Sequence, residues 1–435
     1  MNQIELAWPR CEHEQVDSTG FRIGWDHAHH GLVPPPELLL DGSPIGEGWR
    51  AARVVHAHRG RSWPANRHTR QWLALRVEAW RAGDEFDLAT VTPNHLAQIE
   101  ARQCPARRTW LGGGEPVQGA DAPQVARLNP QAAYAAGNLV VLSRAAAQAW
   151  QGLGVADLVR RARAAEMAEL LSDSRAARIT TFGADGPVDA AAIAASTAED
   201  EQAVPATLDA AAWWRLAALR SFATPLPATD AARMPLAALP PNRVRVLNAV
   251  QALQVLLTLR LAMPDWCAQM GAFAAMLPAH SLRTDFNLWV GALVPRLLEA
   301  QALGRNVARA LEDAWLGERV QRRWQHFVLS LGEPAFEPLV RRLSAQKIGR
   351  RTIEHLSRDQ ALDGWSIGAP TPISAPSRRE LSEAAPAPCV ERRPSEPAPA
   401  AAPQAHARPA ALRRTARTPF GPPPRATTGP QRAAR

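Results

Sequence analysis

Lysine and tyrosine are almost missing from this chain of 435 residues, in which Lys347 is the single lysine and Tyr134 the single tyrosine. Nearly all of the positive charge is therefore carried by arginine. Abundant Ala, Arg and Pro are typical of a protein from a GC-rich genome. The arginine content is thus not, by itself, an indication of phosphate binding.

Cysteine pairs are missing as well. The four cysteines are far apart in the sequence and form no Cys-x-x-Cys motif, which argues against a zinc ribbon and against a disulfide framework. This usage indicates a reducing compartment, and we expect a cytoplasmic protein. The first ten residues lack a basic region followed by an apolar stretch, so we expect no signal peptide.

A hydrophobic run long enough to cross a membrane is the third absence. The longest uncharged apolar run, Val246 to Leu259, is shorter than the roughly 20 residues that a spanning helix needs. It is bracketed by Arg245 and Arg260. We expect a buried helix here and no membrane partner.

The net charge of +9 is unevenly distributed. Residues 401–435 contain seven arginines and no acidic residue, so the first 400 residues are close to neutral. Only residues 47–110 hold a local excess, eleven arginines against six acidic residues. If the folded part binds nucleic acid, whether DNA or RNA, the contacts must come from this stretch or from Arg127. The candidate residues are Arg50, Arg53, Arg59, Arg61, Arg67, Arg70, Arg107, Arg108 and Arg127.

The apolar pattern predicts a mainly helical protein with a small α+β domain. With 46% hydrophobic residues, the chain can bury two or three cores. We expect an irregular segment rich in Gly, Pro, Trp and His at 1–65, with turns and short strands, and helices plus a ββα module at 66–172. A linker at 173–204, an all-helical domain at 205–365 and a disordered tail rich in Pro, Ala and Arg at 366–435 complete the prediction.

Two helices preceding the module have recognisable ends. From Asn66 the apolar residues repeat at spacings of three and four, and Gly83 should end that helix. Thr92 is a plausible N-cap, with Pro93 at the first helical position of a second helix. Further along, the pattern from Val155 to Leu171 predicts an amphipathic helix.

The segment from Val125 to Ser143 carries the most specific pattern. A short strand leads into a loop of about ten residues, which contains Tyr134 and closes with Gly137 and Asn138, and an apolar strand then enters a helix. Together with Cys104 and Pro105 upstream, residues 90–152 resemble the ββα core of HNH endonucleases.

That resemblance implies three functional positions. Asn138 corresponds to the middle residue, which ties down the loop. The general-base position holds Arg127, which stays protonated near neutral pH and cannot act as a base. The position on the helix that completes the metal site holds Ala147, whose methyl group cannot bind a metal. The resemblance therefore implies a retained fold with lost catalysis, and no cofactor.

Histidines could supply a metal site in place of the missing ligands. Eight of the twelve histidines precede residue 96. On a strand, residues two apart share a face, so Cys11, His13, His27 and His29 could assemble a zinc site. Alternatively, these histidines stack on aromatic rings or bind backbone groups. Tryptophans among the arginines could likewise stack on single-stranded nucleic acid or form the core.

Three functional hypotheses remain open. The first is a nucleic-acid-associated protein with a catalytically degenerate HNH-like module. The second is an active metal-dependent endonuclease whose divalent metal is held by N-terminal histidines. The third is a helical scaffold for protein interactions without a nucleic-acid role.

Overall fold

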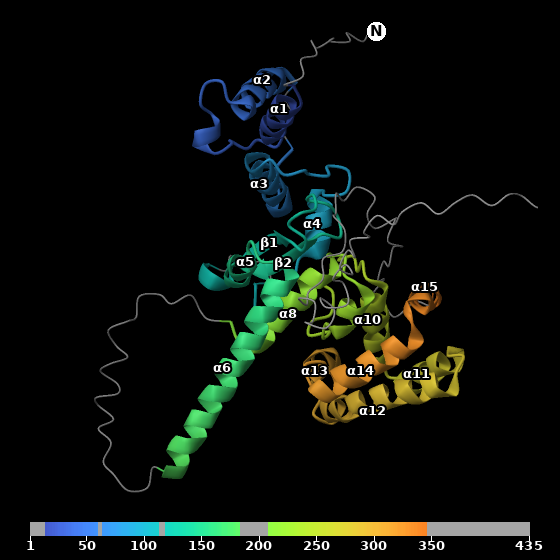
Figure 1. Cartoon of the computed structure of the whole chain (residues 1–435). Coiled ribbons are helices and arrows are strands. Elements are labelled where there is room, and N and C mark those ends of the chain that lie inside the picture. Colours follow the sequence, from blue (N-terminus) through green and yellow to red (C-terminus); the bar gives the residue numbers. More distant parts are fainter. Residues whose placement is uncertain (1–13, 60–62, 113–117, 183–207, 346–435) are drawn as a thin grey trace, which may run out of the picture. The chain divides into compact units, whose positions relative to one another are not determined.

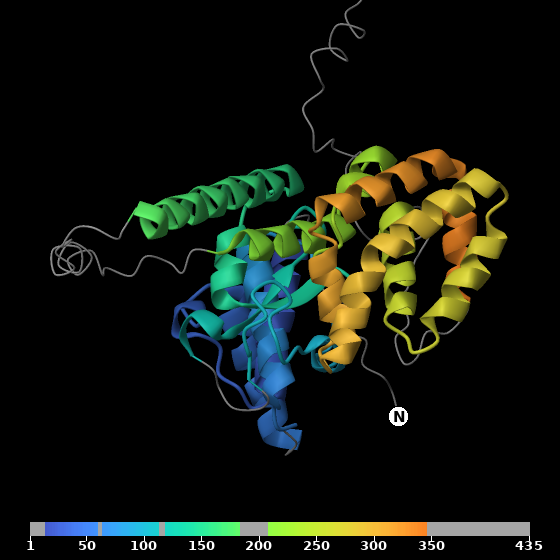
Figure 2. The ribbon, with the colours of Figure 1, turned by 90° about the horizontal axis from the view of Figure 1, so that it is seen from below.

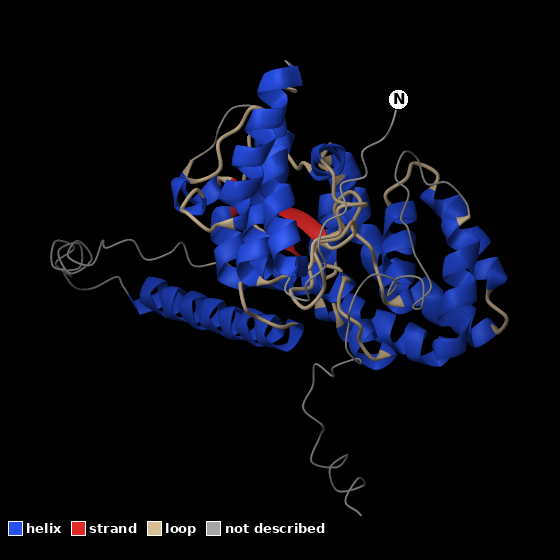
Figure 3. Cartoon of the chain, turned by 90° about the horizontal axis from the view of Figure 1, so that it is seen from above, coloured by secondary structure: helices blue, strands red, loops and turns tan. Residues whose placement is uncertain are grey.

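The computed structural model describes residues 14–59, 63–112, 118–182 and 208–345. These residues form fourteen α-helices and one two-stranded sheet, which confirms the prediction of a mainly helical protein (Figure 3). None of the helices in the described ranges is long and apolar enough to cross a membrane. The predicted tail at 366–435 lies outside the described residues.

The N-terminal region differs from the prediction of turns and short strands for residues 1–65. It contains helices α1 (Glu14–His29) and α2 (Pro44–Arg59), joined through the short 3-10 helix η1 (Pro36–Leu38). The prediction assigned the glycines of this segment to turns. They lie inside α1 and α2, where they let the two helices pack closely. A Cβ atom on Gly24 would lie 1.9 Å from the Ile45 carbonyl oxygen, and one on Gly48 would lie 1.9 Å from that of Phe21.

The two helices before the sheet begin where their caps predict. Helix α3 (Arg67–Ala82) starts at Asn66, whose side chain accepts a hydrogen bond from the Thr69 amide, and ends at Gly83 with φ 70°. Helix α4 (Pro93–Ile99) starts at Thr92, whose hydroxyl accepts from the His95 amide. The sequence prediction is confirmed for both.

The sheet consists of strands β1 (Pro123–Arg127) and β2 (Leu139–Ser143), preceded by η2 (Gly119–Asp121). The strands are antiparallel, and Arg127 pairs with Leu139 across the turn. Every residue of β2 is buried, and its last residue, Ser143, accepts a hydrogen bond from the Ala146 amide as the N-cap of α5 (Arg144–Trp150). The chain order is therefore strand, strand, helix.

Helix α6 (Val155–Phe182) is longer than the predicted amphipathic helix. It continues through the first ten residues of the predicted 173–204 linker, because Ala and Arg there still favour a helix. The remainder of that linker, 183–204, lies outside the described residues. Figure 1 shows α6 beside α8 (Ala210–Phe222), and the Trp214 indole N–H donates to Glu166 at 2.7 Å.

Residues 208–345 are mostly helical, with a longer non-helical connection at 234–248, and residues 346–365 are not described. Aromatic rings of α12 (His280–Ala302), of α14 (Glu318–Leu331) and at the end of α13 (Val307–Ala314) pack together, and Trp289, Trp315 and Trp324 are fully buried. Figure 2 shows the ribbons of α12 and α14, in yellow and orange, side by side. The elements after α8 are α9 (Ala228–Arg233), α10 (Ala249–Leu261), α11 (Trp266–Met276), α12 (His280–Ala302), α13 (Val307–Ala314), α14 (Glu318–Leu331), η3 (Glu333–Ala335) and α15 (Phe336–Ser344).

One hydrophobic core runs through the sheet region and the C-terminal helices. It extends from Leu75 on α3 through β2 to Leu343 on α15. The apolar run predicted to form a buried helix is α10, nearly all of whose side chains are buried. The regions that the sequence divides at 173–204 thus share their interior.

Candidate functional site at the two-stranded sheet

Asn138 fastens the loop between the strands. Its side-chain oxygen accepts from the Asn129 amide at 2.7 Å, and its Nδ2 donates to the Asn129 and Ala133 carbonyls at 3.0 and 2.9 Å. The side chain is fully buried, so these bonds satisfy groups that have no access to water. Asn138 therefore holds both ends of the loop together.

Arg127 is tied into the same loop. One of its terminal nitrogens lies 2.6 Å from the Asp84 carboxylate, and the other donates to the Ala132 carbonyl at 3.1 Å. The guanidinium lies over the Tyr134 ring at 4.4 Å. Asn138 also approaches the Ala132 carbonyl, at 3.5 Å, so the two side chains converge there. Arg127 thus has structural partners within the chain.

Tyr134 closes the loop against the segment before α4. Its backbone forms a bridge with Phe86, and the two rings stack at 5.8 Å. Burial, together with the neighbouring Glu78 carboxylate, raises the pKa of the Tyr134 hydroxyl to about 12. The hydroxyl is therefore protonated at neutral pH and is no base either.

Ala147 lies on α5 in the hydrophobic core, with 6% of its surface exposed. Its position offers no donor atom to a metal. Among the described residues, no group of three or more His, Cys, Asp or Glu side chains could hold a metal ion. The positions implied for a base and a final ligand are thus occupied by an ion-paired arginine and a buried methyl group.

Arg220 on α8 is an unexpected neighbour of this region. Its guanidinium is 2% exposed, donates to the Trp150 carbonyl at 3.1 Å and lies 4.3 Å from the centre of the Trp150 ring. Burial, and secondarily the charge of Arg127, lowers its pKa to about 10. No pattern in the sequence indicates this contact, because Arg220 lies 70 residues from Trp150 in a mostly apolar helix.

Arg107 and Arg108 also have partners within the chain. Arg107 lies 2.7 Å from Asp121. Arg108, with φ 59°, forms a two-pronged pair with Asp313 at 2.8 and 2.7 Å and also lies 3.1 Å from Glu312. Arg215 adds a further bond to Asp313 at 3.2 Å. This network, Arg108, Arg215, Glu312 and Asp313, links the loop before β1 to α8 and α13.

The predicted arginines on α2 and α3 differ from these. Arg50, Arg53 and Arg70 are exposed, and no ion pair joins them to a described residue, although Arg50 donates to the Leu39 carbonyl and Arg53 covers the Trp49 ring. Arg67 pairs with Glu100 at 2.8 Å. The side chain of Arg59, and Arg61 as a whole, lie outside the description.

The proposed zinc ligands do not share a strand face. His27 and His29 belong to helix α1, where residues two apart point in different directions. His27 donates from Nδ1 to the Ile23 carbonyl, and His29 lies against the rings of His30 and His56. The geometric basis of the prediction was therefore wrong. Cys11 and His13 lie outside the described residues.

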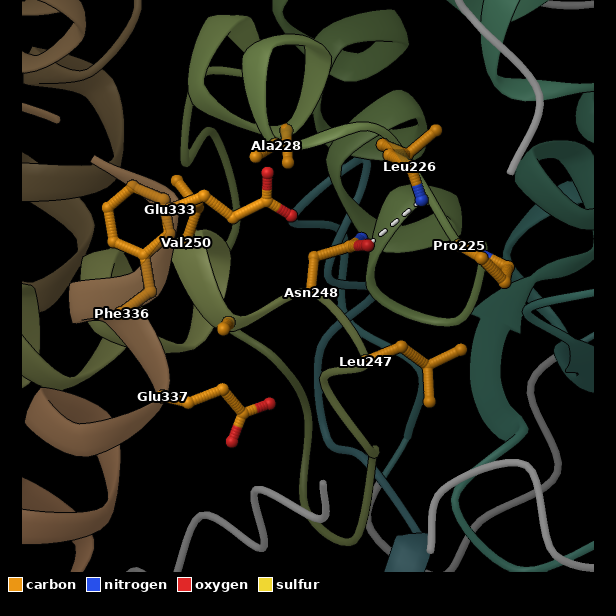
Figure 4. A pocket seen from close by; sticks show the side chains of 11 residues that line it. Pro225, Leu226, Ala228, Leu247, Asn248, Val250, Glu333, Phe336 and Glu337 are labelled. Atoms are coloured by element: carbon orange, nitrogen blue, oxygen red, sulfur yellow. Dashed lines mark hydrogen bonds between the residues drawn. The ribbon is translucent and has the colours of Figure 1, made fainter. Parts of the chain in front are cut away.

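A small cavity lies away from the sheet, between the N-terminus of α10 and α15 (Figure 4). Glu333 and Glu337 stand on one side, and Asn248 on the other uses its side chain to hold the Leu226 amide at 2.9 Å. Its amide group also donates to Ser221, Thr224 and Gln251. The Asn248 side chain therefore stabilises the fold, and its donor and acceptor groups are already hydrogen-bonded within the chain.

Comparisons with protein families, with curated proteins and with solved structures give no match to this chain.

Proposed function

We propose that this chain is a nucleic-acid-associated protein whose ββα module resembles that of HNH endonucleases and does not cleave. The main support for the proposal is the contrast between two side chains of the loop, Asn138 and Arg127. Asn138 makes the buried bonds that shape it, while Arg127 at the base position is paired with Asp84. The residue that shapes the loop is therefore present. The positions implied for a general base and a metal ligand carry no group that could activate water or bind a metal.

Contact with nucleic acid is assigned to the arginines of α2 and α3. Arg107, Arg108 and Arg127 already neutralise carboxylates inside the chain, and releasing them would leave acidic groups unpaired. Arg50, Arg53 and Arg70 are exposed and available to phosphates.

A binding experiment tests the location. The full chain is titrated with duplex DNA at several salt concentrations, because each phosphate contact contributes a slope of about −0.9 in log affinity against log salt. The double variant Arg50→Gln/Arg53→Gln should reduce the slope by about two units. The matched control, Arg319→Gln/Arg323→Gln, removes two exposed charges from α14 and should leave it unchanged. Equal effects of the two variants would refute the assignment.

A cleavage experiment tests the loss of catalysis. Plasmid and single-stranded DNA are incubated with the full chain and magnesium, manganese or zinc. We expect no cleavage above background. Metal-dependent cleavage would favour the alternative of an active endonuclease.

A helical interaction scaffold is the second candidate, favoured by the ion pairs that four predicted contact residues form within the chain: Arg67, Arg107, Arg108 and Arg127. It becomes the better account if deleting residues 401–435 abolishes binding, since the affinity would then come only from the seven arginines of that segment.

A further inference from the structure

A hollow lined mainly by α3 and the chain that follows α1 lies apart from the sheet. Its volume is about 680 Å³, within the range of sites that hold small organic ligands. Leu73 and Val77, 1% and 5% exposed, form a buried floor, while Val33, 65% exposed, and the exposed Ala74 supply apolar surface to the hollow. The hollow thus presents apolar surface that is open to solvent.

Helix α3 contributes one continuous face to this hollow. Arg70, Leu73, Ala74 and Val77 follow the spacing of three and four residues that places side chains on one side of a helix. Glu78, one turn further along, also lines it. Arg70 and Glu78 are separated by about 12 Å along the helix axis, at 1.5 Å per residue.

Not every charged side chain around the hollow has a partner within the described residues. Arg81 pairs with Glu37 at 2.6 Å, and Glu78 lies beside the Tyr134 hydroxyl. Arg70 is exposed and makes no ion pair with any described residue. An apolar hollow with a free guanidinium at one end and a carboxylate at the other favours a ligand that is anionic at one end only.

His27 completes the floor as a neutral ring. It is 6% exposed, and its Nδ1 donates to the Ile23 carbonyl at 2.8 Å. Burial lowers the pKa of His27, so the ring is uncharged at neutral pH. The floor is therefore compatible with an apolar ligand body.

We propose that this hollow binds an amphipathic organic anion, whose apolar body lies against Val33 and Ala74 and whose carboxylate is held by Arg70. Arg70 is shared with the arginines assigned to nucleic acid, whereas Arg50 and Arg53 of α2 lie outside the hollow. Because the guanidinium forms charge-assisted hydrogen bonds with a carboxylate, an anion should be preferred over an uncharged ligand of the same length.

The experiment uses the full chain and three probes of equal chain length: octanoate, n-octanol and octyltrimethylammonium. Binding is followed by saturation-transfer NMR and calorimetry. Octanoate should bind about tenfold more tightly than n-octanol, the low end for a hydrogen bond to a charged group at a partly exposed site. The cationic probe should bind most weakly.

Two variants locate the site. Arg70→Gln should remove the preference for octanoate over n-octanol. Ala74→Glu, at an exposed position one turn from Arg70, should pair with that arginine and weaken octanoate binding by at least tenfold. The control, Arg323→Gln, removes an exposed arginine of α14 outside the hollow and should leave octanoate binding unchanged.

Three results would overturn the proposal: no binding of octanoate, no preference for it over n-octanol, or equal affinities in the wild-type chain and both variants. All the proteins compared retain residues 401–435, so nonspecific attraction of anions by that segment is constant. DNA binding is measured separately and can fail without affecting this result.

Discussion

At the residue scale, the side chain of Asn138 forms the hydrogen bonds that regular secondary structure would otherwise provide to the backbone of a buried loop. Backbone groups in a buried loop cannot be satisfied by water and need partners within the protein. Asn138 provides three such bonds, to the amide and carbonyl of Asn129 and the carbonyl of Ala133. An asparagine carries both donor and acceptor, and no apolar residue could replace it.

Asn138→Ala should therefore lower the free energy of unfolding by about 3 kcal/mol, because buried polar groups left without partners cost about 1–3 kcal/mol each. Urea denaturation of the full chain measures this. Gln131→Ala, at an exposed position of the same loop, is the control and should change stability by less than about 0.5 kcal/mol. Similar values for the two variants would show that the bonds of Asn138 contribute little.

The lowered pKa values of three histidines predict how the stability of the fold changes with pH. Burial lowers the pKa of His27, His30 and His95 below the ordinary value of 6.5. The unfolded chain then binds more protons than the folded chain. Their contribution to stability is present above pH 6.5 and is lost as the pH falls from there toward the folded-state values.

The thermal midpoint should accordingly be lower at pH 5.5 than at pH 7.5, as measured by calorimetry. His95 lacks a hydrogen bond to its buried Nε2 and is further disfavoured as a cation by Arg243. His95→Asn should therefore flatten the dependence. A midpoint that stays constant or rises on acidification would contradict this reading.

At the element scale, helix ends were predictable and glycine-rich helices were not. Asn66, Gly83 and Thr92 act through neighbours within a few residues, so local sequence suffices. Gly24 and Gly48 have their effect through contact with another helix. Glycine favours turns locally, and only the packing of α1 on α2 shows why it stands inside both helices.

Gly24→Ala and Gly48→Ala should each destabilise the chain by about 2 kcal/mol or more, since the added Cβ would collide with backbone of the facing helix. Gly291→Ala offers a matched control on α12, where a Cβ meets open space. It should be stabilising by about 0.5–1 kcal/mol, because alanine favours a helix. Urea denaturation, which measures the free energy of unfolding, distinguishes destabilisation from stabilisation. Stabilisation by the first two substitutions would contradict the close packing.

At the scale of the described molecule, much of the candidate site depends on contacts that the sequence could not predict. The loop with Asn138 and Arg127 is local and was recognisable. The partners of Arg108 lie some 200 residues away, and Arg220 reaches α5 from another helix. Periodicity predicts that a helix exists but not which distant carboxylate faces a given arginine. The arginines predicted to bind phosphate were therefore partly structural.

The ββα segment is an integral part of one folded unit. The shared core and the Arg108 network join it to α8 and α13. A module retained for structure should unfold together with these helices, whereas an autonomous domain would open by itself.

Native-state hydrogen exchange of the full chain tests this most directly. Amides of β2 and α8 should exchange with opening free energies equal within about 1 kcal/mol, and Asn138→Ala should lower both by the same amount. If β2 exchanged through a separate opening while α8 kept its full protection in Asn138→Ala, the ββα segment would be an independent domain and the claim would be wrong.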